Sequence, residues 1–169
     1  MGASVVFVSG PSTAATPPNV DLVKIESGRE MYKAVLDELP ADVAVFVAAV
    51  GDWYFDEVAE QKIKKDNDRS PVLKFKENPD ILRHVSNLKE NRPQLVIGFA
   101  AETSDLHKNA ETKFKKKGCD WIIANDVSDS TGVMGGDKNK ITIFTKEKKE
   151  DWPLMLSLIH ISEPTRPLS

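Results

Sequence analysis

The sequence contains a single cysteine, Cys119, among 169 residues. One cysteine excludes a disulfide within the chain and is typical of a protein from a reducing compartment, so we expect a cytoplasmic protein. No apolar run approaches the roughly 18 residues that a transmembrane helix needs. No basic segment followed by an apolar one opens the chain either, so we expect neither a secretory leader nor contact with a membrane.

Several well-known motifs are also missing. The sequence has no Gly-x-Gly-x-x-Gly fingerprint, no Walker sequence and no Cys/His spacing of the kind that holds a metal. The missing glycine fingerprint disfavours a Rossmann-type oxidoreductase, which stays a remote alternative. None of the three histidines, His84, His107 and His160, lies in a pattern that indicates a catalytic triad, and Cys119 is more typical of a small buried residue than of a nucleophile.

The charge is nearly balanced, with 23 Lys and Arg against 26 Asp and Glu, which gives a formal net charge of −3. This balance disfavours nucleic acid as a partner. The lysines are nevertheless clustered, and a local basic surface can bind a small anion on a mildly acidic protein. The lysine-rich stretches lie at 62–65, 74–76, 113–117 and 138–149.

Apolar runs of strand length alternate with helical patterns along the chain. We expect strands near residues 4–8, 20–25, 43–50, 72–76, 94–99, 121–124 and 140–145, the last of them an antiparallel edge strand. We expect helices near residues 28–39, 78–88 and 104–117. The alternation predicts an α/β, Rossmann-like, mostly parallel sheet with helices on both faces. The unbroken apolar run of residues 43–50 predicts a strand that is buried on both faces.

Helix ends carry clear signals. Ser27 followed by Glu30 is a capping-box pattern at the start of the first helix. Asn78 before Pro79 is typical of an N-cap followed by the first helical position, with Asp80 in the first turn. Gly118 is typical of a residue that ends a helix.

The end of the predicted strand at residues 43–50 is the first candidate site, because ligands of α/β proteins bind beyond the carboxyl ends of strands. Asp52 lies there and either binds a cation or a ligand amine, or caps the loop. Lys62, at the start of Lys-Ile-Lys-Lys, either helps to neutralise a triphosphate or belongs to a solvated charge run on a mobile flap over residues 61–70.

Three features further along the chain each have a binding interpretation and a purely structural one. The helix start at Asn78 is either an anion or base-edge site or simply a good cap. Phe99 offers an aromatic face to a base or ribose, or is a core residue. Lys113 and Lys117 share one helix face and either bind phosphates or form a surface stripe, whereas Lys115 and Lys116 lie off that face.

The C-terminal residues differ in character from the rest. The segment from Leu156 to Arg166 resembles the translation of a transposon sequencing adaptor, although a genuine helical terminus is the alternative. We therefore expect one domain over residues 1–153 and a non-native tail over residues 156–169.

Five segments, taken in order, resemble one family: Ala48–Trp53, Lys62–Lys65, Asn78–Leu82, Gly98–Thr103 and Ala124–Val127. Over roughly residues 2–153 the chain is similar to the phosphopantothenate–cysteine ligase domain, the C-terminal half of the bacterial bifunctional flavoprotein of coenzyme A synthesis. The blocks Lys-Ile-Lys-Lys and Gly-Phe-Ala-Ala-Glu-Thr are the most specific of the five.

The resemblance implies a site for CTP and Mg²⁺. It assigns nucleotide contacts to Phe46, Val47, Ala48, Asp52, Lys62, Pro79, Asp80, Ile81, Leu82, Phe99, Lys113 and Lys117. It implies that Asp52 also binds the cation, that Lys62 is the catalytic flap lysine, and that Ala48 and Ala49 contact phosphopantothenate.

The resemblance further implies that 4'-phosphopantothenate, L-cysteine and CTP are the substrates and that the protein is a homodimer. The carboxylate attacks the α-phosphorus of CTP, and the cysteine amine then attacks the acyl-cytidylate. FMN belongs to the decarboxylase half of the bifunctional protein, which the matching region does not include.

Two departures from the family pattern stand out. The family domain begins with a further strand–helix unit that carries a functional asparagine, and we expect this chain to lack that unit. A CTP-binding fragment without turnover is therefore the alternative to an active ligase. Gly51 replaces the usual alanine, which a loop should tolerate.

Overall fold

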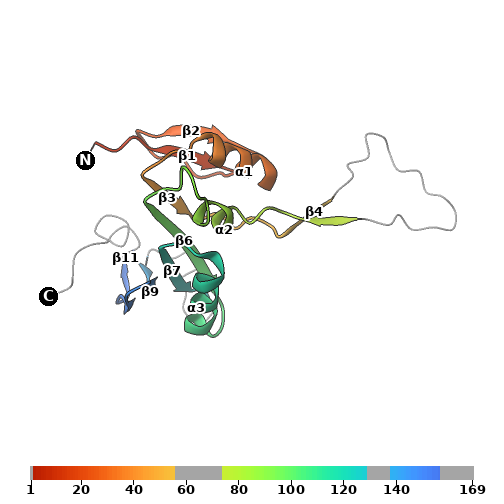
Figure 1. Cartoon of the computed structure of the whole chain (residues 1–169). Helices are drawn as coiled ribbons and strands as arrows, with labels where there is room; N and C mark the ends of the chain where they lie inside the picture. Colours follow the sequence, from red (N-terminus) through yellow and green to blue (C-terminus); the bar gives the residue numbers. More distant parts are fainter. Residues whose placement is uncertain (1, 56–73, 129–137, 157–169) are drawn as a thin grey trace. The chain divides into compact units, whose positions relative to one another are not determined.

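The computed structural model describes residues 2–55, 74–128 and 138–156 (Figure 1). The chain groups into two compact units, one from residues 1–39 and 48–81 and the other from residues 40–47 and 82–169. No helix among the described residues is long and apolar enough to cross a membrane.

The second unit is built on a five-stranded sheet of order β10-β9-β7-β6-β3. Its strands are β3 (Val43–Phe46), β6 (Leu95–Glu102), β7 (Trp121–Asp126), β9 (Ile141–Thr145) and β10 (Lys149–Asp151). β3, β6 and β7 are parallel, whereas β9 and β10 add antiparallel strands beyond β7. The sheet is therefore mixed, and its parallel part carries two of the predicted site residues, Phe46 and Phe99.

One face of this sheet packs against α2 (Ile81–Ser86) and α3 (Leu106–Lys117), and Figure 1 shows α3 lying along β6 and β7. Val96, Ala100 and Ile122 are fully buried on this face. Gly98 allows the close approach of α2, because a Cβ at this position would lie 2.5 Å from Cδ2 of Leu82.

On the opposite face, the C-terminal part of the described chain packs near β9. Ile141, Ile143 and Trp152 form a buried cluster there, and Ile123 packs against it. β11 (Met155–Leu156) pairs with β8 (Lys138–Asn139). Of the predicted tail at residues 156–169, only the residue at 156 is described, and the rest lies outside the described residues.

The first unit contains a parallel pair, β1 (Val6–Ser9) and β2 (Asp21–Lys24), followed by α1 (Gly28–Asp37). The predicted capping box of α1 is confirmed. The amide of Glu30 donates to the Ser27 hydroxyl at 3.2 Å, and that hydroxyl donates to the Glu30 carboxylate at 2.8 Å. An antiparallel ribbon of β4 (Trp53–Phe55) and β5 (Phe75–Glu77) completes the unit.

The prediction of a strand over residues 43–50 that is buried on both faces is wrong. β3 ends at Phe46, and Val43, Val45 and Val47 are 50%, 53% and 64% exposed. The exposed valines alternate with the half-buried Ala44 and Phe46, so among the described residues one face of β3 has no layer packed on it. An apolar run predicts a strand, but burial depends on neighbours that the run does not specify.

Other boundaries also differ from the predictions. β6 continues through Glu102 rather than ending near Phe99, because its last residues pair with β7. Trp53–Phe55, where the sequence predicts no strand, form β4. β9 is not an edge strand, because β10 pairs with its outer side. The predicted flap over residues 61–70 lies outside the described residues.

Candidate functional site

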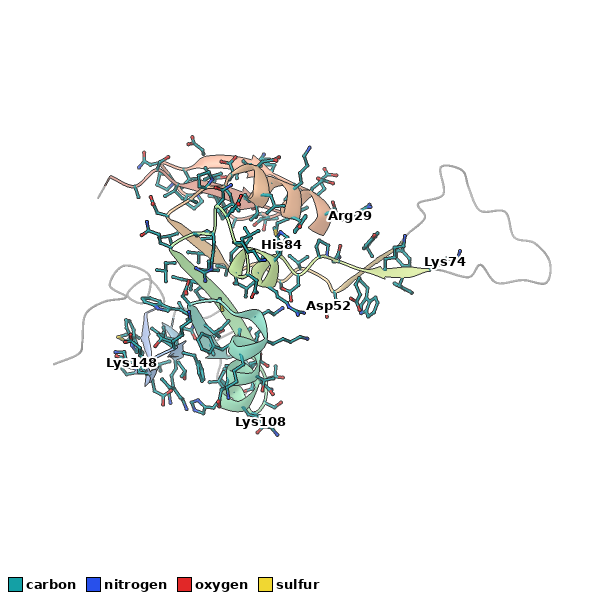
Figure 2. The ribbon with its side chains drawn as sticks, viewed as in Figure 1. Arg29, Asp52, Lys74, His84, Lys108 and Lys148 are labelled. Carbon is teal, nitrogen blue, oxygen red and sulfur yellow. The ribbon has the colours of Figure 1, made fainter. Side chains whose placement is uncertain are left out.

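Asp52 lies at a bend between the end of the apolar run and β4, and Figure 2 shows it at the start of the extended segment that leads to the β4–β5 ribbon. Asn78 determines the geometry of this bend. Its side-chain Nδ2 donates to the Gly51 carbonyl at 2.8 Å, and its main-chain N–H donates to the Asp52 carbonyl at 2.8 Å.

These contacts correct the prediction that Asn78 is the N-cap of a helix over residues 78–88. The helix α2 spans Ile81–Ser86 only, so Asn78 lies three positions before its first residue, and the Asn78 side chain donates to the distant bend. Pro79 and Asp80 are half-buried and precede the helix. A helix of six residues also has few aligned peptide dipoles, so that the predicted anion site at its N-terminus loses most of its physical basis.

The Asp52 carboxylate is exposed, and it makes no hydrogen bond or ion pair within the described part of the chain. The loop-capping alternative therefore finds no support among those residues. Nor do the described residues contain a group of three or more His, Cys, Asp or Glu side chains that could hold a metal ion. A single carboxylate does fit Mg²⁺ that arrives with a nucleotide, because such an ion uses one or two carboxylates together with phosphate oxygens.

In the second unit, Phe46, Leu82 and Gly98 come together. Phe46 is the last residue of β3 and lies directly across from Gly98 in the ladder. Leu82 packs over Gly98 from α2. Phe99 is half-buried in the middle of β6 and points to the opposite face of the sheet, since side chains alternate along a strand. The structure therefore separates Phe99 from Phe46 and Leu82.

The other predicted contacts near these segments differ in exposure. Val47, Ala48 and Ala49 follow β3 and are exposed. Ile81 is only 5% exposed and is a core residue at the start of α2. Lys62 lies outside the described residues, so its role stays a prediction.

The lysines of α3 fall into two groups, as the helical spacing predicts. Lys113 and Lys117 are half-buried, whereas Lys115 and Lys116 are exposed. The Lys113 ammonium lies 3.9 Å from the Glu102 carboxylate at the end of β6. The Lys115 ammonium forms an exposed ion pair with Glu111 at 2.6 Å. Lys113 is therefore directed toward the carboxyl end of the sheet, where ligands of α/β folds bind.

The thiol of Cys119 is 1% exposed, as expected for a small core residue. Burial raises its pKa to about 11, with smaller opposing contributions from hydrogen bonds. A thiol with a raised pKa is protonated at neutral pH and is a poor nucleophile. The structure thus agrees with the interpretation that Cys119 has a packing role.

Two contacts between different elements were not predicted from the sequence. Glu102 pairs with Lys113, and the helix pattern gave no signal for a partner on another element. The Arg29 guanidinium lies 4.6 Å from the centre of the Tyr54 ring. Each contact joins two different elements, and no local sequence pattern shows which elements pack together.

The sequence and fold of this chain are similar to those of known proteins. Residues 1–158 match the family described as DNA/pantothenate metabolism flavoprotein C-terminal domain. The coenzyme A biosynthesis bifunctional protein CoaBC of Vibrio cholerae is 41% identical over 156 residues, which are 91% of this chain and 39% of that protein. The chain thus spans about two fifths of the length of this curated relative.

Two solved structures are similar in fold. The crystal structure of the C-terminal domain of CoaBC has a TM-score of 0.70 and 30% identity, and the match covers 92% of this chain and 69% of that one. A Cab2 variant in complex with phosphopantothenate-cysteine has a TM-score of 0.53 and 15% identity, over 80% of this chain and 47% of that one. The second likeness shows the fold alone.

The mixed sheet with its helices and these structural neighbours confirm the predicted α/β, Rossmann-like class. Within that class, the chain belongs to the DNA/pantothenate metabolism flavoprotein C-terminal domain family, and it corresponds to the phosphopantothenate–cysteine ligase domain of the CoaBC proteins.

Proposed function

We propose that this chain forms the nucleotide-binding part of a CTP-dependent phosphopantothenate–cysteine ligase of coenzyme A biosynthesis. The observation that carries the proposal is the match of 91% of the chain to CoaBC of Vibrio cholerae at 41% identity. The CoaBC C-terminal domain, similar to this chain at 30% identity and a TM-score of 0.70, supports the same assignment.

The proposed reaction has two steps. A carboxylate oxygen of 4'-phosphopantothenate attacks the α-phosphorus of CTP, so that pyrophosphate leaves and an acyl-cytidylate forms. The amine of L-cysteine then attacks the acyl carbon and loses a proton as the amide forms, and CMP leaves with the electron pair of the broken carbon–oxygen bond. Both steps depend on positioning and on neutralising phosphate charge more than on a protein nucleophile.

The lysines among the described residues can supply positive charge to the phosphates. Lys113 is half-buried and directed toward the end of β6, so its ammonium can exchange Glu102 for a phosphate oxygen. Lys117 lies one helical turn further along the same face and adds a second positive charge. Lys62 is proposed as the catalytic lysine that covers the triphosphate.

The remaining residues are proposed to hold the substrates. Asp52 binds the nucleotide together with Mg²⁺, which supplies positive charge to the phosphates when it is bound. Phe46, Val47, Ala48, Pro79, Asp80, Ile81, Leu82 and Phe99 are proposed to surround the nucleotide. Ala48 and Ala49 are proposed to contact phosphopantothenate.

A product assay tests the proposal. The protein is mixed with CTP, Mg²⁺, 4'-phosphopantothenate and L-cysteine, and pyrophosphate, CMP and the amide are followed, with ATP in place of CTP as the control nucleotide. We expect the three products in equal amounts with CTP and much less with ATP. Pyrophosphate without amide indicates activation alone. If CTP binds but no product forms, the chain is a CTP-binding fragment without turnover. Preferential binding of NADH contradicts the proposal.

We also propose that the protein forms a homodimer. Sedimentation velocity measures this directly. A single species at the mass of one chain across the micromolar range contradicts a stable dimer.

A further inference from the structure

Asn78 binds both of the peptide groups that flank Asp52. Its side-chain Nδ2 donates to the Gly51 carbonyl, and its main-chain N–H donates to the Asp52 carbonyl, each at 2.8 Å. A peptide group is planar, so a hydrogen bond to its carbonyl restrains the orientation of the whole group. The two planes meet at the Asp52 Cα. Restraining both planes therefore fixes φ and ψ of Asp52 and the direction of its Cα–Cβ bond.

The first residue of α1 packs against the same place. A Cβ on Gly28 would lie 2.8 Å from Cγ1 of Val50 and 3.3 Å from Oδ1 of Asn78. Glycine is a poor helix former, so its position at the start of α1 has a packing reason. The absent side chain leaves the room that the Asn78 amide and the segment before Gly51 occupy.

We propose that Asn78 is a positioning residue of the nucleotide site, which directs the Asp52 carboxylate, and that Gly28 provides the space for it. The inference rests on the proposed function for the role of Asp52. The geometry of the bend is independent of that function.

The physical benefit is preorganisation. The Asp52 carboxylate is exposed and makes no contact within the described chain that would direct it. A carboxylate on an unrestrained bend would lose backbone freedom on binding a ligand, which weakens the affinity. Two hydrogen bonds from Asn78, which lies 27 positions after Gly51, remove that freedom before the ligand arrives.

A double-mutant cycle tests whether Asn78 acts through Asp52. The affinity for CTP with Mg²⁺ is measured by calorimetry for the wild type, Asn78→Ala, Asp52→Asn and the double variant. We expect each single substitution to weaken binding about tenfold, the scale of one lost hydrogen bond or ion contact. We expect the double variant to bind about as weakly as the weaker single variant, since neighbours that act together are not additive. Fully additive losses would overturn the proposal.

Asn109→Ala is the matched control. The Asn109 side chain also donates to a backbone carbonyl, that of Ser104, at 2.9 Å, but this bond lies at the start of α3 and not in the bend at Asp52. Its removal should leave the CTP affinity unchanged. A loss equal to that of Asn78→Ala would show a general effect of destabilisation and would contradict a positioning role.

Gly28→Ala is a second variant that retains the asparagine. The added methyl displaces Val50 or the Asn78 amide, so we expect weaker CTP binding in a chain that remains folded. Wild-type affinity in this variant would contradict the role given to Gly28. This variant also tests the proposal if Asn78→Ala does not fold.

Hydrogen exchange separates this inference from the proposed function. Without nucleotide, the amide of residue 78 donates to the Asp52 carbonyl, and we expect its exchange to be at least about tenfold faster in Asn78→Ala than in the wild type. Equal exchange rates would overturn the inference. If the wild type binds no CTP but this amide is protected as expected, the proposed function fails and the geometric inference stands.

Discussion

At the scale of single residues, Gly98 shows how the sheet and α2 approach each other. A Cβ there would lie 2.5 Å from Leu82 and 2.9 Å from Ile122. Leu82 is half-buried and Ile122 is fully buried, so a shift of either methyl group disturbs packing between α2 and the sheet. The absent side chain is therefore part of the close packing between helix and sheet.

We predict that Gly98→Ala lowers the free energy of unfolding by about 1–3 kcal/mol, the usual cost of overpacking a core. Urea denaturation measures it. Gly51→Ala is the matched control, because a Cβ there meets only the Trp53 carbonyl, at 3.9 Å. We expect the control to change the stability by no more than about 0.5 kcal/mol. Equal effects of the two substitutions would contradict the packing argument.

Cys119 gives a prediction on reactivity. Its thiol is buried and its pKa is raised to about 11, from an ordinary value of 9.0. We expect iodoacetamide at pH 8 to alkylate the native protein much more slowly than the protein in urea. The folded pKa lies above the unfolded pKa, so this thiol favours the folded state below pH 9, and that contribution is lost as the pH rises toward 11. Equal alkylation rates in the two states would contradict the burial of this thiol.

At the scale of elements, the start of α1 is fixed by local sequence. Ser27 and Glu30 form the capping box, and a second oxygen of the Glu30 carboxylate accepts from the amide of Glu26 at 2.9 Å. These partners are within four positions of one another. For this reason the sequence pattern was sufficient to predict them.

We predict that Ser27→Ala lowers the free energy of unfolding by about 1 kcal/mol at pH 7. Hydrogen bonds from the Glu26 amide and then from Ser27 hold the pKa of Glu30 below its usual range. A lowered folded pKa stabilises the protein above the unfolded pKa, and this contribution is lost as the pH falls through the folded pKa. The effect of Ser27→Ala should therefore be smaller at pH 3 than at pH 7. Ser104→Ala, at an exposed serine before α3, should have little effect at either pH.

Elements that depend on distant partners could not be predicted in this way. Asn78 has the local signals of an N-cap, but α2 begins only at Ile81, and Asn78 donates two hydrogen bonds to the bend at Asp52. Trp53–Phe55 becomes a strand only because Phe75–Glu77 pairs with it. The apolar run near Val43 predicted a strand correctly and its burial wrongly, since exposure is set by the neighbours of β3 and not by its own composition.

At the scale of the whole molecule, the order of the sequence motifs predicted the family, and the comparisons confirm it. The structure adds that Lys113 is directed toward the end of β6 and that α3 has an inner and an outer set of lysines. The place of Lys62 stays a prediction.

The edge of the sheet leads to a prediction on association. β3 presents Val43 and Val45 at the end of the sheet order, 50% and 53% exposed, without a charged residue in the strand. Exposed apolar edge strands favour pairing between molecules, and an edge lysine opposes it. We predict that Val45→Lys lowers the aggregated fraction in light scattering at high protein concentration. Leu154→Lys, at a position that is 58% exposed but away from β3, should have a smaller effect.

The most direct test of the central claim is calorimetric titration of the protein with CTP in the presence of Mg²⁺, for the wild type, Lys113→Ala and Lys115→Ala. The two lysines are on the same helix, but only Lys113 is half-buried beside the end of β6. We expect that the wild type binds CTP and not NADH, that Lys113→Ala weakens CTP binding about tenfold or more, and that Lys115→Ala leaves it unchanged. No binding of CTP, or equal losses in the two variants, would contradict this claim.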